Sequence, residues 1–328
     1  KSLLGGTPLT DLGNEATCER MRLMADMGFQ FTAFHFGTVT ADVAALLARQ
    51  HRLIDEMELI CNWRRRDDIK EDVGRLASAH ERPILLARVR SGQDEDFGGT
   101  KFHHFVSFGF RRSECADVAR FVEQNRLAGE IGGLACSIPD GSDPWEELAG
   151  LSDFSAGSGF ALAAHIQLSN VVPAVANNDD GLLAGKVATA MSAAFAHPRA
   201  SVFLDTFMDI DRGYCPRWGL YDRRCNPRSA AHVFRHLQAL LGAGAESVVL
   251  GDTSTAGGCR RRQFMQGSLH HTLLLPDGAM DREQAERAVD EGPAETCWDL
   301  ESGLDDRALA VAALARGMPV LLTGREAI

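Results

Sequence analysis

The sequence lacks the compact motifs that identify most metal-binding, nucleotide-binding and nucleic-acid-binding proteins. Its eight cysteines form no C-x-x-C pair and no compact cysteine–histidine spacing, so a structural zinc site is not expected. No G-x-G-x-x-G follows a predicted strand and no G-x-x-x-x-G-K-[ST] occurs, which excludes the two usual nucleotide-binding loops. Lys and Arg number 34 against 45 Asp and Glu, for a net charge of −11. Because phosphate binding needs concentrated positive charge, we expect no nucleic-acid partner, and we also expect no metal and no cofactor.

Long apolar segments and sorting signals are missing as well. No apolar run approaches the ~18 residues of a membrane-spanning helix, and no signal peptide is visible. Apolar residues make up 45% of the chain and charged residues 24%, which is typical of soluble globular proteins. We therefore expect a soluble protein without a membrane span, and these absences favour a cytoplasmic location. The sequence leaves the oligomeric state open.

Helical and strand-like segments alternate along residues 1–242. The expected strands cover residues 29–36, 58–62, 83–89, 102–108, 131–138, 160–168 and 202–207, and the expected helices cover residues 15–27, 41–53, 68–79, 114–126, 182–197 and 227–241. Strands followed by helices at this spacing predict βα units and a parallel sheet. The number of units favours an α/β fold of the (β/α)8 TIM-barrel type over an open, doubly wound sheet.

The pattern changes after residue 242. Residues 247–250, 268–275 and 319–323 are strand-like and are joined by turns such as Gly257-Gly258 and Asp277-Gly278. This pattern predicts a small β-rich C-terminal domain over residues 243–328. A helical interpretation competes with it over residues 281–290 and 305–315.

Polar and aromatic residues gather at the predicted carboxyl ends of the barrel strands. In a parallel barrel the side chains at these ends line the active site. Carboxylates and amides bond to vicinal hydroxyl groups, and an aromatic ring stacks on the apolar face of a sugar. The pattern therefore predicts a carbohydrate pocket, with six substrate-binding candidates: His35, Asn62, Trp63, Gln167, Asp211 and Trp218. The alternative to a binding role for His35 is that of a core histidine whose hydrogen bonds are satisfied. The alternative for both tryptophans is ordinary packing.

The catalytic candidates are Asp205, Asp209 and His165. If the strand continued past residue 207, Asp205, Asp209 and Asp211 would share one face, and their mutual repulsion would raise the pKa of at least one carboxyl, as a general acid requires. The alternative is that the strand ends there and the later aspartates cap turns or pair with nearby arginines. His165 shares its face with Gln167, which favours a pocket role.

One segment resembles a known family. Asp209, Gly213-Tyr214, Arg217-Trp218-Gly219-Leu220 and Asn226-Pro227-Arg228 resemble the last barrel strand and following loop of clan-A glycoside hydrolases, as seen in family 1 β-glucosidases. Trp298-Asp299-Leu300, Ser302-Gly303 and residues 319–322 are similar to the small β-domain that follows some of these barrels. The resemblance implies a (β/α)8 glycosidase that uses two carboxylates, one as acid/base and one as nucleophile.

The sequence departs from that family at the catalytic pair. Clan-A enzymes carry glutamates at the ends of the fourth and seventh strands, the first as Asn-Glu. Here the only Asn-Glu, Asn14-Glu15, begins a helix, and the strand that contains His165 ends without a glutamate. Three functions remain open: a glycosidase with acid groups from Asp205 and Asp209, a catalytically degenerate relative that binds carbohydrate, and a metal-dependent sugar isomerase or lyase that uses His165 with the aspartates.

Overall fold

The computed structural model describes residues 4–91, 106–168, 179–205, 207–209, 219–242, 247–292 and 295–325. The chain divides into two compact units. The first consists of Lys1–Ile138, Ala149–His165 and Arg199–Phe203, and the second of Pro139–Leu148, Ile166–Pro198 and Leu204–Ile328. The predicted domain boundary at residue 242 stays a prediction, because residues 243–246 lie outside the described part.

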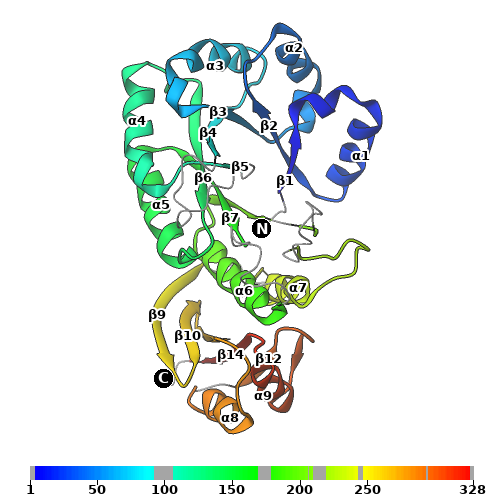
Figure 1. Ribbon diagram of the computed structural model, residues 1–328, viewed down its shortest axis with the longest axis vertical. Helices are drawn as coiled ribbons and strands as arrows, with labels where there is room; N and C mark the ends of the chain where they lie inside the picture. The colour runs from blue at the N-terminus through cyan, green and yellow to red at the C-terminus, as the bar shows by residue number, and fades with distance from the viewer. Residues whose placement is uncertain are drawn as a thin grey trace. The chain divides into compact units, whose positions relative to one another are not determined.

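A parallel sheet forms the centre of the first unit (Figure 1). Its strands follow one another in the order β1 (Leu4–Pro8), β2 (Gln30–Phe36), β3 (Glu56–Cys61), β4 (Ile84–Ser91), β6 (Ile131–Ile138), β7 (Ala161–Gln167) and β8 (Ala200–Asp205). The pairs from β1 to β6 are parallel, whereas the short β5 (Val106–Phe108) pairs antiparallel with β4. These strands curl into a half-barrel, which confirms the predicted parallel barrel architecture.

Helices connect the strands of this sheet. They are α1 (Glu15–Asp26), α2 (Ala41–Gln50), α3 (Ile69–Ala77), α4 (Cys115–Gln124), α5 (Pro144–Ser158) and α6 (Asp180–Ala196), with α7 (Ser229–Gly242) after β8. The side chains of Asn14, Thr40 and Asp179 accept hydrogen bonds from the first turns of α1, α2 and α6, as expected of N-cap residues. Sequence analysis missed β1 and α5, although Pro144 and the buried Trp145 and Leu148 mark the start of α5.

Helix α7 starts two residues later than the sequence indicates. The expected helix begins at residue 227, but the side-chain amide of Asn226 donates to Asp222 at 2.8 Å in the segment before the helix. The N–H of Arg228 donates to the carbonyl oxygen of Leu220, so residues 226–228 belong to the loop before the helix. The helix begins at Ser229.

An antiparallel sheet dominates the second unit. Its order is β13 (Leu304–Asp305), β12 (Thr296–Asp299), β14 (Val320–Arg325), β11 (Leu269–Pro276), β10 (Cys259–Gln266) and β9 (Val248–Ala256). Helices α8 (Arg282–Asp290) and α9 (Arg307–Ala315) occur where a helical interpretation competed with the strand pattern. The predicted β-rich C-terminal region is therefore confirmed, with two helices added to it.

A buried arginine fixes part of this second unit. The guanidinium of Arg262, which is 2% exposed, pairs with Asp143 at 2.7 Å and lies 4.8 Å from the centre of the Trp145 ring. The indole N–H of Trp145 donates to Ser192 Oγ at 2.9 Å. These contacts attach the start of α5 to β10 and α6, and they satisfy a charge that would be costly to bury unpaired.

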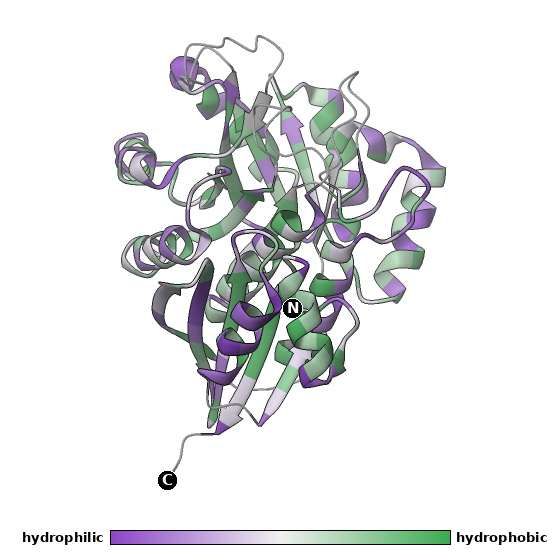
Figure 2. Cartoon of the chain, turned by 60° about the horizontal axis from the view of Figure 1, so that its bottom comes forward, coloured by the Kyte–Doolittle hydropathy of each residue, from purple (hydrophilic) through white to green (hydrophobic). Residues whose placement is uncertain are grey.

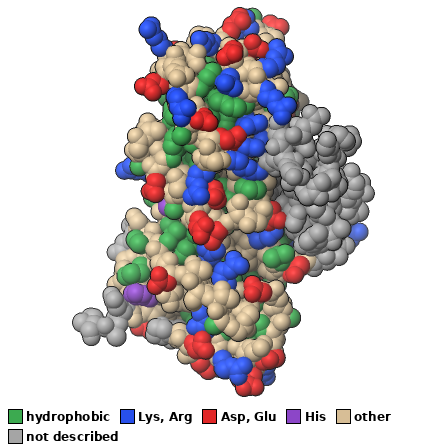
Figure 3. Space-filling view, turned by 60° about the vertical axis from the view of Figure 1, so that its left-hand side comes forward, with side chains coloured by type: hydrophobic (Ala, Val, Ile, Leu, Met, Phe, Trp, Pro, Cys, Tyr) green, Lys and Arg blue, Asp and Glu red, His purple; other side chains and the backbone are tan. Residues whose placement is uncertain are grey.

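Apolar and polar residues separate as a globular fold requires. Hydrophobic residues concentrate on the strands and on the helix faces that cover them (Figure 2). On the face drawn in Figure 3, basic and acidic side chains are interspersed. No described helix is long and apolar enough to cross a membrane.

Gly133 on β6 lies where the barrel interior has no room for a side chain. A Cβ atom at this position would lie 2.4 Å from Leu85 Cδ2 and 2.5 Å from the carbonyl oxygen of Ala161. We expect Gly133→Ala to destabilise the fold by about 1–3 kcal/mol, because a backbone atom cannot move aside cheaply. A thermal melt checks this expectation. The control is Gly129→Ala, whose Cβ would meet nothing within 4 Å and which should leave the melt unchanged; equal melts for the two variants would contradict the close approach.

Candidate active site

A buried carboxylate and a histidine meet inside the half-barrel. On β3, Glu56 and Glu58 alternate with Met57 and Leu59, so the two carboxylates lie on the face of the sheet that Ile60 shares. Glu58 is only 3% exposed, and its Oε1 lies 2.9 Å from His165 Nε2 on β7. The pair joins two strands that are separated in the sheet order by β4 and β6.

The imidazole ring of His165 is held in place by Phe203 on β8. The two rings stack with centroids 4.7 Å apart and planes 10° apart. The side chain of His165 is 29% exposed, whereas that of Glu58 is 4% exposed. The histidine is therefore the end of the pair that solvent reaches, and the glutamate fixes its Nε2 as the hydrogen-bond donor.

This arrangement can transfer protons. With Nε2–H bound to a carboxylate, a neutral imidazole keeps Nδ1 as its basic nitrogen, and an imidazolium ion there is stabilised by the buried charge. A carboxylate–imidazole pair can thus act as general base or general acid toward a substrate that reaches the ring.

A second carboxylate, Glu56, is the first residue of the same strand and is partly buried. Glu56 accepts hydrogen bonds from Ser201 Oγ at 3.1 Å and from Thr32 Oγ1 at 3.2 Å. Burial raises the pKa of the Glu56 carboxyl, and the neighbouring charge of Glu58 adds to the rise, while the two hydroxyl donors oppose it. Glu56 is near the amino end of β3, away from the strand ends at which barrel active sites lie.

Three of the predicted substrate-binding residues make contacts within the fold. Nε2 of His35 lies 3.1 Å from the carbonyl oxygen of Thr38, in agreement with a satisfied core histidine. Asn62 caps the short 3-10 helix Trp63–Asp68 by accepting from Arg64 N at 3.1 Å. Trp63 packs edge-on against two phenylalanine rings at 5.0 and 5.2 Å. Their roles in sugar binding stay predictions.

Asp209 holds together the two chain segments that follow β8. Its Oδ1 accepts from Gly219 N at 3.0 Å, and its Oδ2 pairs with Arg228 at 2.5 Å. Gly219 has no space for a Cβ atom, which would lie 2.3 Å from Asp209 N. Both carboxylate oxygens are thus used within the fold. Sequence analysis kept open a pairing with Arg212, Arg217, Arg223 or Arg224, whereas the arginine that pairs with Asp209 is Arg228.

The remaining predicted residues are only partly described. Gln167 is the last residue of β7 and is partly buried. Asp205 is the last residue of β8, and its side chain lies outside the described part. Asp211 and Trp218 also lie outside it. Within the residues that the structure describes, no three His, Cys, Asp or Glu side chains form a group that could hold a metal ion.

Sequence analysis missed Glu58, the partner of His165. The signal was present, because Glu56 and Glu58 alternate with apolar residues in a strand, which places two acids on one face. That alternation could not show which face is interior, nor that β7 would bring a histidine to it, since both depend on how the sheet curls.

Comparisons with known proteins show the fold. No family model and no curated protein matches this chain. Among solved structures, a family 39 glycoside hydrolase from Bacteroides cellulosilyticus WH2 is similar with a TM-score of 0.55 and 12% identity, over 82% of this chain and 64% of that chain. The chain thus spans less than two thirds of that enzyme's length. At this identity the likeness confirms the barrel architecture expected from the resemblance, and it shows nothing further.

Two other solved structures are similar at lower scores. A family 30 xylanase from Clostridium acetobutylicum has a TM-score of 0.44 and 11% identity, with 85% of this chain and 74% of that chain covered. An α-amylase from Lactobacillus plantarum has a TM-score of 0.43 and 9% identity, with 98% of each chain covered.

The raised pKa of Glu56 predicts a pH-dependent stability. A carboxyl group whose pKa is higher in the folded than in the unfolded protein favours folding while it is protonated. This contribution to the free energy of unfolding is complete below the unfolded pKa of about 4.3, and it is lost as the pH rises through the folded pKa. We therefore expect Glu56→Gln to raise the melting temperature at pH 7, and we expect this advantage to shrink toward pH 4. Glu123 is exposed, so Glu123→Gln serves as the control and should leave the melting temperature unchanged at both pH 7 and pH 4. Equal destabilisation by Glu56→Gln at both pH values would contradict the assignment.

Proposed function

We propose that this chain is a glycoside hydrolase-type barrel that binds a carbohydrate at the carboxyl ends of its parallel strands and cleaves it by acid/base chemistry. The observation that carries the proposal is the Glu58–His165 pair, a proton-transfer group on the interior face of a barrel whose fold matches a glycoside hydrolase. Acid/base cleavage of a glycosidic bond needs no metal ion. General acid–base catalysis by a histidine raises the reaction rate by about 10²–10⁴-fold.

We propose Asp205 as the second acid group. Asp205 is the last residue of β8, the strand at the end of the sheet order. A carboxylate at the end of a barrel strand is the position that a catalytic acid requires. Asp209 is assigned to holding the loop after β8, because its oxygens are bound to Gly219 and Arg228.

A second candidate function is carbohydrate binding without hydrolysis. It is favoured by the carboxyl end of β7, where the last residue is Gln167 rather than a glutamate. A degenerate barrel of this kind would still bind a sugar, and the sugar would raise the melting temperature by mass action on the folded state. Binding without turnover across a wide panel of glycosides would select this function.

Hydrolysis of aryl glycosides by the purified protein tests the first function. We expect turnover of at least one substrate that EDTA does not affect, and we expect Asp205→Asn to abolish that turnover while sugar binding stays measurable. Unchanged turnover in Asp205→Asn would remove this residue from the mechanism, and loss of turnover with EDTA would show that cleavage depends on a metal ion and would contradict the proposed acid/base mechanism.

Two histidines on strands of the parallel sheet, His165 and His35, allow a matched test of the dyad. We expect His165→Gln to lower kcat by about 10²–10⁴-fold, because proton transfer to or from the substrate is lost. His35→Gln, which changes a histidine that contacts the carbonyl of Thr38, should leave kcat within about threefold of the parent value. Equal losses in both variants would indicate a structural effect and not a catalytic one.

A further inference from the structure

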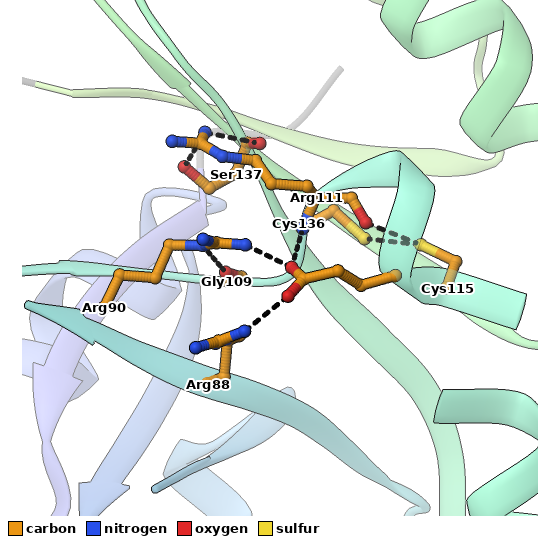
Figure 4. A network of polar contacts seen from close by, with 8 residues as sticks. Arg88, Arg90, Gly109, Arg111, Cys115, Cys136 and Ser137 are labelled. Carbon is orange, nitrogen blue, oxygen red and sulfur yellow. Dashed lines mark hydrogen bonds and ion pairs between the residues drawn. The ribbon is translucent and has the colours of Figure 1, made fainter. Parts of the chain in front are cut away.

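Two buried cysteines face each other between α4 and β6. Cys115 is the first residue of α4, and Cys136 lies in β6. Their sulfur atoms are 3.7 Å apart, and the two residues are 1% and 0% exposed (Figure 4). Both are free thiols, and the function proposed above uses neither of them.

A polar network fixes the backbone on both sides of the two thiols. Glu114, the residue before Cys115, makes ion pairs with Arg88 and Arg90 on β4 and accepts from the N–H of Arg111 at 2.7 Å (Figure 4). The guanidinium of Arg111 in turn donates to the carbonyl and hydroxyl oxygens of Ser137 at 3.1 and 3.2 Å. The start of α4 and the carboxyl end of β6 are therefore held side by side, with the sulfur atoms between them.

We propose that Cys115 and Cys136 are a redox-active pair that a small peroxide converts into an intramolecular disulfide. The sulfur atoms must approach from 3.7 Å to about 2.05 Å, which is a closure of about 1.7 Å shared by two side chains. Rotation about the side-chain bonds supplies that movement without displacing β6.

The two thiols have different roles in this step. Cys115 directly follows the partly exposed turn Arg112–Glu114, whereas Cys136 lies within the buried strand β6. The pKa of Cys136 is raised well above its usual value, first because of its hydrogen bond with the sulfur of Cys115 and second because of burial. Cys115 is therefore the thiol that attacks the peroxide, and Cys136 keeps its proton until the second step.

The reaction balances with hydrogen peroxide as the two-electron oxidant. The Cys115 thiolate attacks one peroxide oxygen, the O–O bond breaks, and hydroxide leaves and takes up the proton that Cys115 released. Cys136 then attacks the sulfur of the resulting sulfenic acid, the S–O bond breaks, and water leaves with the Cys136 proton. Two thiols and one peroxide thus give one disulfide and two waters.

Access to the thiols comes through the short segment before α4. The 3-10 turn Arg112–Glu114 has Arg112 and Ser113 exposed, whereas β6 is buried. Exposure of Cys115 to a small uncharged oxidant requires this turn to open, which separates Glu114 from Arg88 and Arg90 but leaves the strands paired. A disulfide would then tie this turn to β6, which we expect to raise the melting temperature by about 5 °C.

Peroxide treatment of the folded full-length chain tests the proposal. The peroxide is removed, remaining thiols are alkylated in denaturant, and intact mass and peptide mapping are recorded. We expect two fewer alkyl groups than on the untreated protein, a cross-linked peptide that joins Cys115 to Cys136, and a higher melting temperature, all reversed by dithiothreitol. The partly buried Cys297 provides the control, and Cys297→Ser should leave the cross-link unchanged.

Two single variants distinguish the roles of the thiols. Cys136→Ser should trap Cys115 as a sulfenic acid that a dimedone-type nucleophile labels, whereas Cys115→Ser should leave Cys136 unmodified. Full alkylation of both thiols after peroxide, overoxidation without a cross-link, or a cross-link formed only in denaturant would each overturn the proposal. None of these outcomes depends on whether the chain cleaves a sugar.

Discussion

The structure depends on the partners that it provides for two carboxylates on one buried strand face. An ionised carboxylate inside a protein is tolerated only when hydrogen bonds or opposite charges replace its water. Glu58 is hydrogen-bonded to His165 on β7, and Glu56 accepts hydrogen bonds from Ser201 on β8 and Thr32 on β2. In a flat sheet β3 would lie about 14 Å from β7 and about 19 Å from β8, so these contacts exist only because the sheet curls. The curl of the sheet therefore brings the far strands to the two carboxylates, and the carboxylates depend on the hydrogen bonds that those strands provide.

The residues on the remaining interior positions are compatible with that curl. Ala87, Ala135 and Ala163 are small and fully buried, and Gly133 has no space for a side chain. Small residues on neighbouring strands allow the far strands to approach β3, and the ring of Phe203 fills the space beside His165. The interior is thus packed on one side of the histidine and polar on the other, which orients the imidazole without enclosing it.

Local sequence signals predicted the elements of this fold better than they predicted the contacts between them. The βα alternation depends on neighbouring residues only, so the sequence predicts it. The partnership of Glu58 with His165 joins residues 107 positions apart, and no periodicity encodes such a distance. The anchoring of Asp209 by Arg228 could not be predicted for the same reason, because the two residues are 19 positions apart and other arginines lie nearer in sequence.

The central claim is that the Glu58–His165 pair faces a carbohydrate. The most direct measurement follows the imidazole nitrogen resonances of His165 by NMR while a panel of saccharides is titrated into the folded protein. The account predicts that at least one saccharide shifts these resonances, with no change at His35. If every saccharide left the His165 resonances unmoved, the pair would be a structural feature of the barrel interior and the proposed site would be wrong.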